Sequence, residues 1–291
     1  METKSNSHSQ SESASSEEVL LLGQDTHQEQ SAHEEHAHTL YAEPVFNIGN
    51  FTVTNSLLTS WLAVFLIIIL SLIIRFKIKK IPSVFQSVVE MIIDGALNMM
   101  DLVTNDRQKS RRIFPVIFCI FIFILFNNWL GLLPGVGSIS FDGHSLFRGG
   151  TADLNTTLAL GLFSVIAANI FGVIVVGGWN YFNKFINLKA ILAIPAKVTK
   201  DPTVLFINPI HFFVGFIEIV SEVAKIASLS FRLFGNVFAG EVLLASISAL
   251  IAFGVPLPFI FLEIIIGVIQ ALIFAVLTLV YFTIASTAHE H

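Results

Sequence analysis

Long apolar runs constrain this chain more than any other feature of its sequence. The first of them covers residues 57–74 and is interrupted only by Thr59, Ser60 and Ser71. A helical run of about 20 apolar residues crosses a hydrocarbon core of about 30 Å. Hydrophobic residues make up 54% of the 291 positions and charged residues only 13%, too little polar material for the surface of a water-soluble protein of this size. The sequence therefore predicts a membrane protein.

Apolar length and periodicity predict six helices, five of which cross the membrane. The predicted crossings are residues 55–75, 113–133, 156–178, 208–253 and 258–286. Residues 113–133 are entered near Pro115, and the segment GVPLP at 254–258, with a turn at 256–258, separates the last two crossings. The remaining helix, residues 83–104, carries one polar stripe on an otherwise apolar surface, which is typical of a helix that lies on the membrane surface or packs on a partner. The predicted fold is an all-α membrane protein with five crossings plus one amphipathic surface helix.

Residues 1–44 differ in kind from the rest of the chain. They hold nine acids, one Lys and five His, and no sustained apolar period. Such a segment cannot bury enough apolar surface to order itself, so we expect a disordered, acidic, His-rich tail ahead of a polytopic membrane domain at 45–291. Its histidines offer ligands to a transition metal, but no rigid frame is evident and the pattern favours solvated low complexity; no metal site is predicted.

The distribution of Lys and Arg predicts the orientation. The connector 75–112 holds eight basic residues, whereas the tail has one and the loop 134–155 has only Arg148. Basic connectors face the cytoplasm. Residues 179–204 return to the cytoplasm with four lysines, so we expect the N-terminus outside and the C-terminus inside.

The segment 208–253 combines unusual length with charges that are costly in lipid. Its 46 residues far exceed the 20 or so that a crossing needs, so the helix must be steeply tilted or lie partly along the membrane. At about 100° per residue one helical stripe gathers several of its polar side chains. These are Glu218, Glu222, Lys225, Arg232 and Asn236. Ionisable groups at this depth usually face protein or water and mark an ion path.

Arg232 stands out within this stripe. No acid lies three or four residues away on its helix, and a guanidinium does not escape its surroundings by losing its charge. We therefore predict a partner on another chain. Glu222 and Lys225, by contrast, fit a structural ion pair as well as an ion path.

A second set of polar groups lies on the last two predicted crossings. Glu263 and Gln270 share a face of the last helix, two turns apart, and Glu241 follows Arg232 by nine residues. Glu241 and Glu263 are expected to meet near the outer turn, where two neighbouring carboxylates can share a proton at neutral pH.

The run SLSFRLFGNVFAGE at 228–241 resembles the signature of subunit a of F-type ATP synthases. Four further motifs resemble the family at matching places, so that the likeness covers about residues 50–288. They are NP at 208–209, NWLGLLPG at 128–135, DLNTT at 153–157 and QALIFAVLTLVY at 270–281.

The resemblance implies roles for individual residues. Arg232 would be the stator arginine that deprotonates the carboxylate of each rotor c subunit. Asn236, Glu241, Glu263 and Gln270 would line the outer half-channel, and Glu218, Ser221 and Lys225 the inner one. The two long C-terminal helices would form a tilted hairpin against the c-ring.

The resemblance also implies a setting. The chain would be a non-catalytic, proton-conducting subunit of the F0 sector in a bacterial inner membrane, with the c-ring, the subunit b peripheral stalk and the remaining synthase subunits as partners, and with no cofactor and no nucleic acid. A departure concerns Glu241 and Glu263, since many relatives pair an acid with a His at these positions.

Two other functions fit the sequence less well. A secondary transporter would bind a solute near the bilayer midplane, but such proteins show internal repeats with broken helices in matching halves, and neither is visible. A purely structural scaffold does not explain Arg232. No phosphate-binding Gly-Lys motif is present, so no nucleotide site is predicted.

Overall fold

The computed structural model describes most of the chain from residue 42 onward. The described residues are 42, 44–49, 51–133, 140–141, 144–145, 147–178, 204–251 and 254–287. Residues 1–41 of the predicted tail therefore lie outside them.

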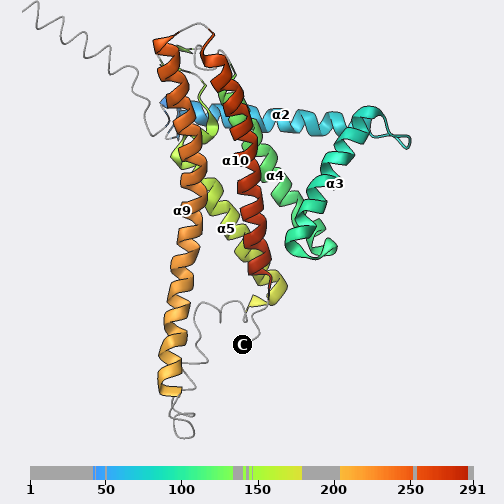
Figure 1. Cartoon of the computed structure of the whole chain (residues 1–291), viewed down its shortest axis with the longest axis vertical. Coiled ribbons are helices and arrows are strands. Elements are labelled where there is room, and N and C mark those ends of the chain that lie inside the picture. The colour runs from blue at the N-terminus through green and yellow to red at the C-terminus, as the bar shows by residue number, and fades with distance from the viewer. Residues whose placement is uncertain are drawn as a thin grey trace, which may run out of the picture. The chain divides into compact units, whose positions relative to one another are not determined.

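Six helices make up nearly all of this part of the chain (Figure 1). They are α2 (Asn55–Lys77), α3 (Val84–Thr104), α4 (Arg107–Gly131), α5 (Leu154–Val176), α9 (Val204–Leu250) and α10 (Pro256–Ala285). A short 3-10 turn, η2 (Gly150–Ala152), precedes α5. Two antiparallel hairpins, β1 (Pro44–Ile48) with β2 (Phe51–Thr54) and β3 (Ser140–Phe141) with β4 (His144–Ser145), are small additions that the sequence patterns did not predict.

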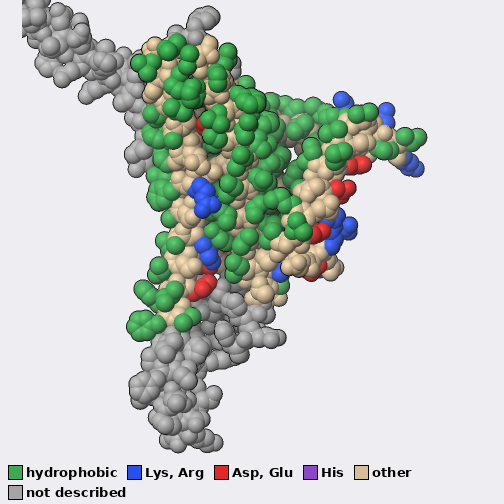
Figure 2. Space-filling model, in the orientation of Figure 1, with side chains coloured by type: hydrophobic (Ala, Val, Ile, Leu, Met, Phe, Trp, Pro, Cys, Tyr) green, Lys and Arg blue, Asp and Glu red, His purple; other side chains and the backbone are tan. Residues whose placement is uncertain are grey.

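Five of these helices are long and apolar enough to cross a membrane: α2, α4, α5, α9 and α10. The amphipathic α3 is not among them. The predicted all-α fold with five crossings and one amphipathic helix is therefore confirmed. Large side chains remain exposed along the crossings, such as Phe65 (59%), Ile174 (73%) and Phe261 (65%). Figure 2 shows such hydrophobic side chains over much of the visible face, an arrangement that suits contact with lipid.

Two helix starts differ from the prediction for identifiable reasons. Helix α4 begins at Arg107 and not at 113, because the Asp106 side chain caps it by accepting hydrogen bonds from the amides of Gln108 and Lys109. Pro115 consequently lies inside the helix and does not mark its entrance.

The predicted turn at 256–258 is also wrong in position. Pro256 begins α10, since proline lacks the amide hydrogen that the first helical position leaves unused. The chain turns at Gly254 instead, whose φ of +81° lies in the region that favours glycine.

The core lies where α4, α5, α9 and α10 pack against one another. One buried cluster joins α4, α5, α9 and α10 through Ile120, Ile124, Val165, Leu229, Leu233, Ala271 and Phe274. A second cluster joins the far end of α4 and α10 to Met100 of α3. The first cluster, which includes Leu229 and Leu233, determines which side of α9 faces the protein and which side is left open.

The directions of the helices bear on their tilt in a membrane. Helices α9 and α10 run alongside each other, and α2 crosses their direction (Figure 1). With 47 residues α9 is about 70 Å long, against a hydrocarbon core of about 30 Å. The 23 residues of α2 reach about 35 Å and must stand nearly upright to cross. An upright α2 leaves α9 strongly inclined, as its length requires.

Candidate ion-conducting site

Helix α9 presents one face to the core and another away from it. Leu229 and Leu233 are buried against the neighbouring helices, whereas Phe231 and Arg232 are exposed. Gly161 of α5 makes the close packing possible, because a Cβ there would collide with the Ser230 hydroxyl and lie 3.1 Å from the Ile226 carbonyl oxygen. The sequence thus fixes the rotation of α9, and this rotation turns Arg232 outward.

Arg232 has no acidic partner among the described residues. Its Nη2 donates to the Ser228 hydroxyl at 3.3 Å, one turn back on the same helix. Figure 2 shows basic side chains along α9 next to a hydrophobic surface. The spacing within one helix predicts that Arg232 has no acidic partner on that helix. No ion pair with an acid is formed by Arg232 in the described part of the fold either.

Asn236 and Gln270 are brought together, as their predicted grouping requires. The Asn236 amide donates to Gln270 Oε1 at 2.8 Å and so bridges α9 and α10. Gln270 is buried, and its Nε2 has no hydrogen-bond partner within the described residues. A buried amide nitrogen without a partner is a donor available to a water molecule or to a passing ligand.

Glu263 lies in a notch on α9. Its carboxylate contacts Gly240, where an added Cβ would collide with the Glu263 carboxylate. Glu263 is 9% exposed and makes no hydrogen bond or ion pair among the described residues. Glu263 therefore lies against the residue that precedes Glu241, and the meeting of the Glu241 and Glu263 carboxylates stays a prediction.

Glu241 has a partner that the sequence patterns did not reveal. Arg148, in the segment before η2, donates through Nε to both carboxylate oxygens, at 3.2 and 3.1 Å, and through Nη2 to Oε2 at 2.9 Å. The side chain of Arg148 is 8% exposed and that of Glu241 26%. The two residues are 93 positions apart, so helical spacing could not connect them.

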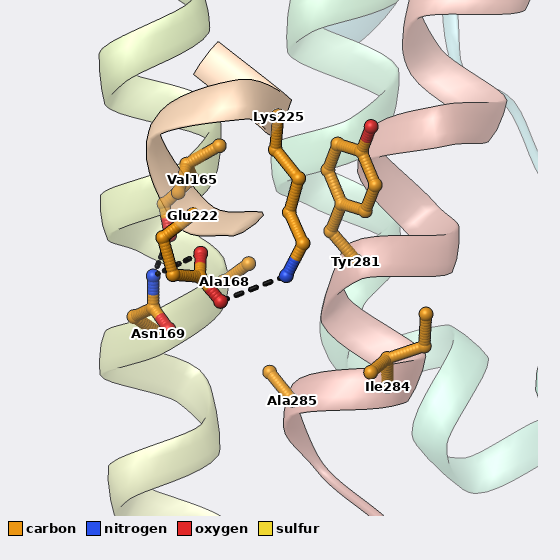
Figure 3. A pocket seen from close by; sticks show the side chains of 8 residues that line it. All are labelled: Val165, Ala168, Asn169, Glu222, Lys225, Tyr281, Ile284 and Ala285. Atoms are coloured by element: carbon orange, nitrogen blue, oxygen red, sulfur yellow. Dashed lines mark hydrogen bonds and ion pairs between the residues drawn. The ribbon is translucent and has the colours of Figure 1, made fainter. Parts of the chain in front are cut away.

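The opposite stretch of α9 carries a second polar cluster. Lys225 Nζ pairs with Glu222 Oε1 at 2.7 Å, and Asn169 of α5 donates to Glu222 Oε2 at 3.2 Å. Lys225 also lies over the Tyr281 ring of α10, 5.5 Å from its centroid. Figure 3 shows these side chains converging from three helices.

These four residues line a small recess that is partly open at the surface. Glu218 and Ser221 are half-buried further along α9 and do not line it. Of the residues predicted for the inner half-channel, only Lys225 therefore lines the recess. Glu222, Asn169 and Tyr281 are added to it by the fold.

The two clusters lie on either side of Arg232. Along α9, Lys225 is about 10 Å and Glu241 about 14 Å from Arg232 in axial rise. A strongly inclined α9 separates the clusters mainly along the membrane and partly across it. The polar groups thus fall into two clusters, one on each side of Arg232. Two separate clusters are suited to conducting an ion in two separate half-channels, or legs. The described residues contain no group of three His, Cys, Asp or Glu arranged to hold a metal ion.

A long intramembrane helix that carries, between two polar clusters, an arginine without an acidic partner among the described residues is typical of a multi-pass protein of the ion-conducting class. The model of the family described as ATP synthase A chain matches residues 57–283. ATP synthase subunit a of Trichlorobacter lovleyi is 31% identical over 227 residues, which cover 78% of this chain and 85% of the relative. The corresponding protein of Syntrophobacter fumaroxidans is 30% identical over 258 residues, covering 87% and 93%. The chain belongs to the ATP synthase A chain family, as its resemblance predicted.

Proposed function

We propose that this chain is the proton-translocating subunit a of an F-type ATP synthase and that Arg232 couples proton flow to rotation of the c-ring. The observation that carries the proposal is the position of Arg232, an exposed cation on an inclined apolar helix without an acid among the described residues. A charge in lipid is costly, and its cost is removed when an opposite charge arrives. A rotor that presents one carboxylate at a time supplies this partner.

The chemistry follows from the permanent charge of the guanidinium. A protonated rotor carboxyl is neutral and can pass through lipid, whereas Arg232 favours the ionised form and releases the proton as the carboxyl arrives. The same fixed cation repels protons and so blocks a direct leak between the two legs. Each proton that crosses the membrane potential yields about 2.3 kcal/mol per 100 mV for rotation.

The two polar clusters supply the legs. Asn236, Gln270, Glu263 and Glu241 form the outer leg, supported by the hydrogen bond between Asn236 and Gln270. Lys225, with Glu218 and Ser221 beside it, belongs to the inner leg. The recess next to Lys225 supports this assignment, because it opens at the surface and is lined by Glu222 and Asn169 as well.

The setting follows from the same proposal. The basic residues at the end of α2 and the start of α4 support a cytoplasmic position for these ends, with the N-terminus outside and the C-terminus inside a bacterial inner membrane. The exposed face of α9 contacts the c-ring, and the peripheral stalk subunit b binds elsewhere on the chain. The subunit conducts protons and performs no catalysis itself.

The test uses the complete synthase reconstituted in vesicles. Arg232→Ala is expected to abolish ATP-driven proton pumping, and Arg232→Lys to retain only a small part of it, since an ammonium lacks the planar fork of the guanidinium. Arg112→Ala, which removes an exposed arginine near the start of α4, serves as the control and is expected to pump normally. Pumping by Arg232→Ala at the rate of the Arg112→Ala control would refute the proposal.

A further inference from the structure

Two carboxylates reach the outer end of the α9 and α10 hairpin, and their surroundings differ. Glu241 is bound at both oxygens by Arg148, and Glu263 lies against Gly240 with no hydrogen bond among the described residues. We infer that Arg148 is a positioning residue of the outer leg, which holds Glu241 as a fixed ion pair and leaves Glu263 as the carboxyl that takes up and releases the proton. The inference rests on the proposed function, and assigns different roles to two residues that the family resemblance treats alike.

The geometry of the ion pair supports a fixed contact. Three hydrogen bonds join the guanidinium to both oxygens of Glu241, and such two-point pairs hold orientation as well as charge. Separating the pair would leave a guanidinium that is 8% exposed without its carboxylate, a costly state away from water. Glu241 therefore stays paired during the passage of a proton.

The backbone on which Arg148 sits is also held in place. A Cβ on Gly150 would collide with the Asn127 side chain and lie 2.6 Å from the Ser60 hydroxyl, and one on Gly131 would lie 2.9 Å from the Gly149 Cα. The segment after Arg148 thus fits between α2 and α4 with no room to shift.

Hydrogen bonds continue this support into the last helix. Thr151 of η2 donates to Asn128 Oδ1 at 2.6 Å, and the Asn128 amide donates to the Gly267 carbonyl oxygen of α10 at 3.1 Å. Gly267 lies one turn from Glu263. The element that positions Arg148 is therefore connected to the helix that carries Glu263.

Other charges near this end do not change the assignment. Asp153, at the start of α5, accepts hydrogen bonds from the Ser56 hydroxyl at 3.0 Å and from the Asn155 amide at 3.0 Å. Asp153 and Glu241 thus both have hydrogen-bond donors within the described residues. Of these three carboxylates, Glu263 alone forms no hydrogen bond or ion pair with another described residue.

Each proton that Glu263 takes up is passed on to the rotor. A proton from the outer aqueous phase binds the Glu263 carboxylate and neutralises it. It then leaves for an ionised rotor carboxylate, by way of the polar side chains of Gln270 and Asn236, and Glu263 returns to its charged form. The Glu241 and Arg148 pair keeps its protonation throughout.

The experiment compares four variants of the reconstituted synthase while the pH of the outer phase is varied. Glu263→Gln is expected to slow proton flux by at least about tenfold at every pH, as for the loss of a group that transfers protons. Arg148→Met leaves Glu241 without its guanidinium partner and is expected to slow the flux and to shift its dependence on the outer pH. Arg148→Lys keeps the charge and is expected to show the smaller shift of the two.

The double variant Arg148→Met with Glu241→Gln separates positioning from folding. It removes the pair without leaving a buried charge, and is expected to show the pH profile of the unmodified protein with a flux above that of Arg148→Met. A double variant that keeps the shifted profile, or a Glu263→Gln variant with normal flux, would overturn the inference. If Arg232→Ala also pumps, the proposed function itself fails; if only the Arg148 results deviate, the inference alone fails.

Discussion

The two arginines at this site, Arg148 and Arg232, are treated in opposite ways by the fold. Arg148 is buried, lies on a segment held between helices, and finds its carboxylate within the same chain. Arg232 is exposed on an apolar helix surface and contacts only the Ser228 hydroxyl among the described residues. The Arg148 guanidinium is paired within the subunit. The Arg232 guanidinium is the one for which we propose a rotor carboxylate as partner.

This difference between the two arginines predicts that they contribute differently to the stability of the folded subunit. A matched buried charge contributes to the folded state chiefly because its loss would strand the opposite charge. An exposed, unmatched charge contributes little to folding, and its conformation is not restricted by a carboxylate. The same residue type is therefore paired with a carboxylate at one end of α9 and has no acidic partner among the described residues in the middle of α9.

The largest expected effect on stability comes from replacing Arg148, and comparing it with the replacement of Arg232 tests this difference. Arg148→Ala is expected to lower the free energy of unfolding of the subunit by about 3 kcal/mol, because Glu241 is left as an uncompensated, partly buried charge. Arg232→Ala is expected to leave stability nearly unchanged while abolishing pumping. Thermal midpoints of the purified synthase variants, measured beside their pumping rates, check both statements. The comparison fails if Arg232→Ala proves the less stable of the two.

The same contrast explains what the sequence could predict. Arg232 was identified because the relevant facts, a missing acid at three or four residues and a stripe of polar groups, lie within one helix. The pairing of Arg148 with Glu241 depends on a contact across 93 positions, which no local period encodes. Asn169 joined the inner cluster for the same reason, since it reaches Glu222 from α5.

The presence of each long helix can be predicted, because a long apolar run is a strong signal. The residues at which the helices begin and end are harder to predict. The start of α4 was placed six residues late because the charged run 107–112 suggests a loop, whereas the Asp106 cap continues the helix through it. The β1 and β2 hairpin, with strands of five and four residues, is too short for an alternating pattern to be distinguished from irregular chain.

A pair of glycines extends the comparison to smaller effects. Gly240 faces the Glu263 carboxylate at the buried end, and Gly235 lies on the exposed face near Arg232, where an added Cβ would meet nothing within 4 Å. Gly240→Ala is expected to cost about 1–3 kcal/mol of stability, because either Glu263 or α9 must shift. Gly235→Ala is expected to be neutral or stabilising by up to about 1 kcal/mol, as for an exposed glycine in a helix.

Thermal midpoints of the two alanine variants decide between these expectations. Equal midpoints would mean that the notch at Gly240 is not tight, and the placement of Glu263 would have to be revised. A deficit at Gly240 that is removed by Glu263→Ala in the same chain would show that the two positions collide.

The smallest expected effect concerns a third arginine, Arg107, whose partner lies outside the membrane crossings. Arg107 Nη1 pairs with Asp101 Oδ2 at 2.6 Å, and the side chains are 39% and 28% exposed. The Ser110 hydroxyl and, after it, the Arg107 guanidinium lower the pKa of Asp101 below its ordinary value of 3.8, against the opposing effect of partial desolvation. Because the folded pKa is the lower one, the contribution to stability is complete well above pH 3.8 and is lost as the pH falls through the folded pKa.

Asp101→Asn should therefore reduce stability slightly at pH 7, and the difference from the unmodified protein should vanish in acid. Added salt should shrink the difference at pH 7, since both groups are near water and the attraction between them is screened. Asp94→Asn, which removes an exposed acid from the same helix, is the matched control and should show neither dependence. Thermal midpoints between pH 7 and pH 3 at low and high salt test the point. An Asp101→Asn deficit that persists in acid, or that equals the Arg148→Ala deficit, would show that exposure does not set the order of the three arginines.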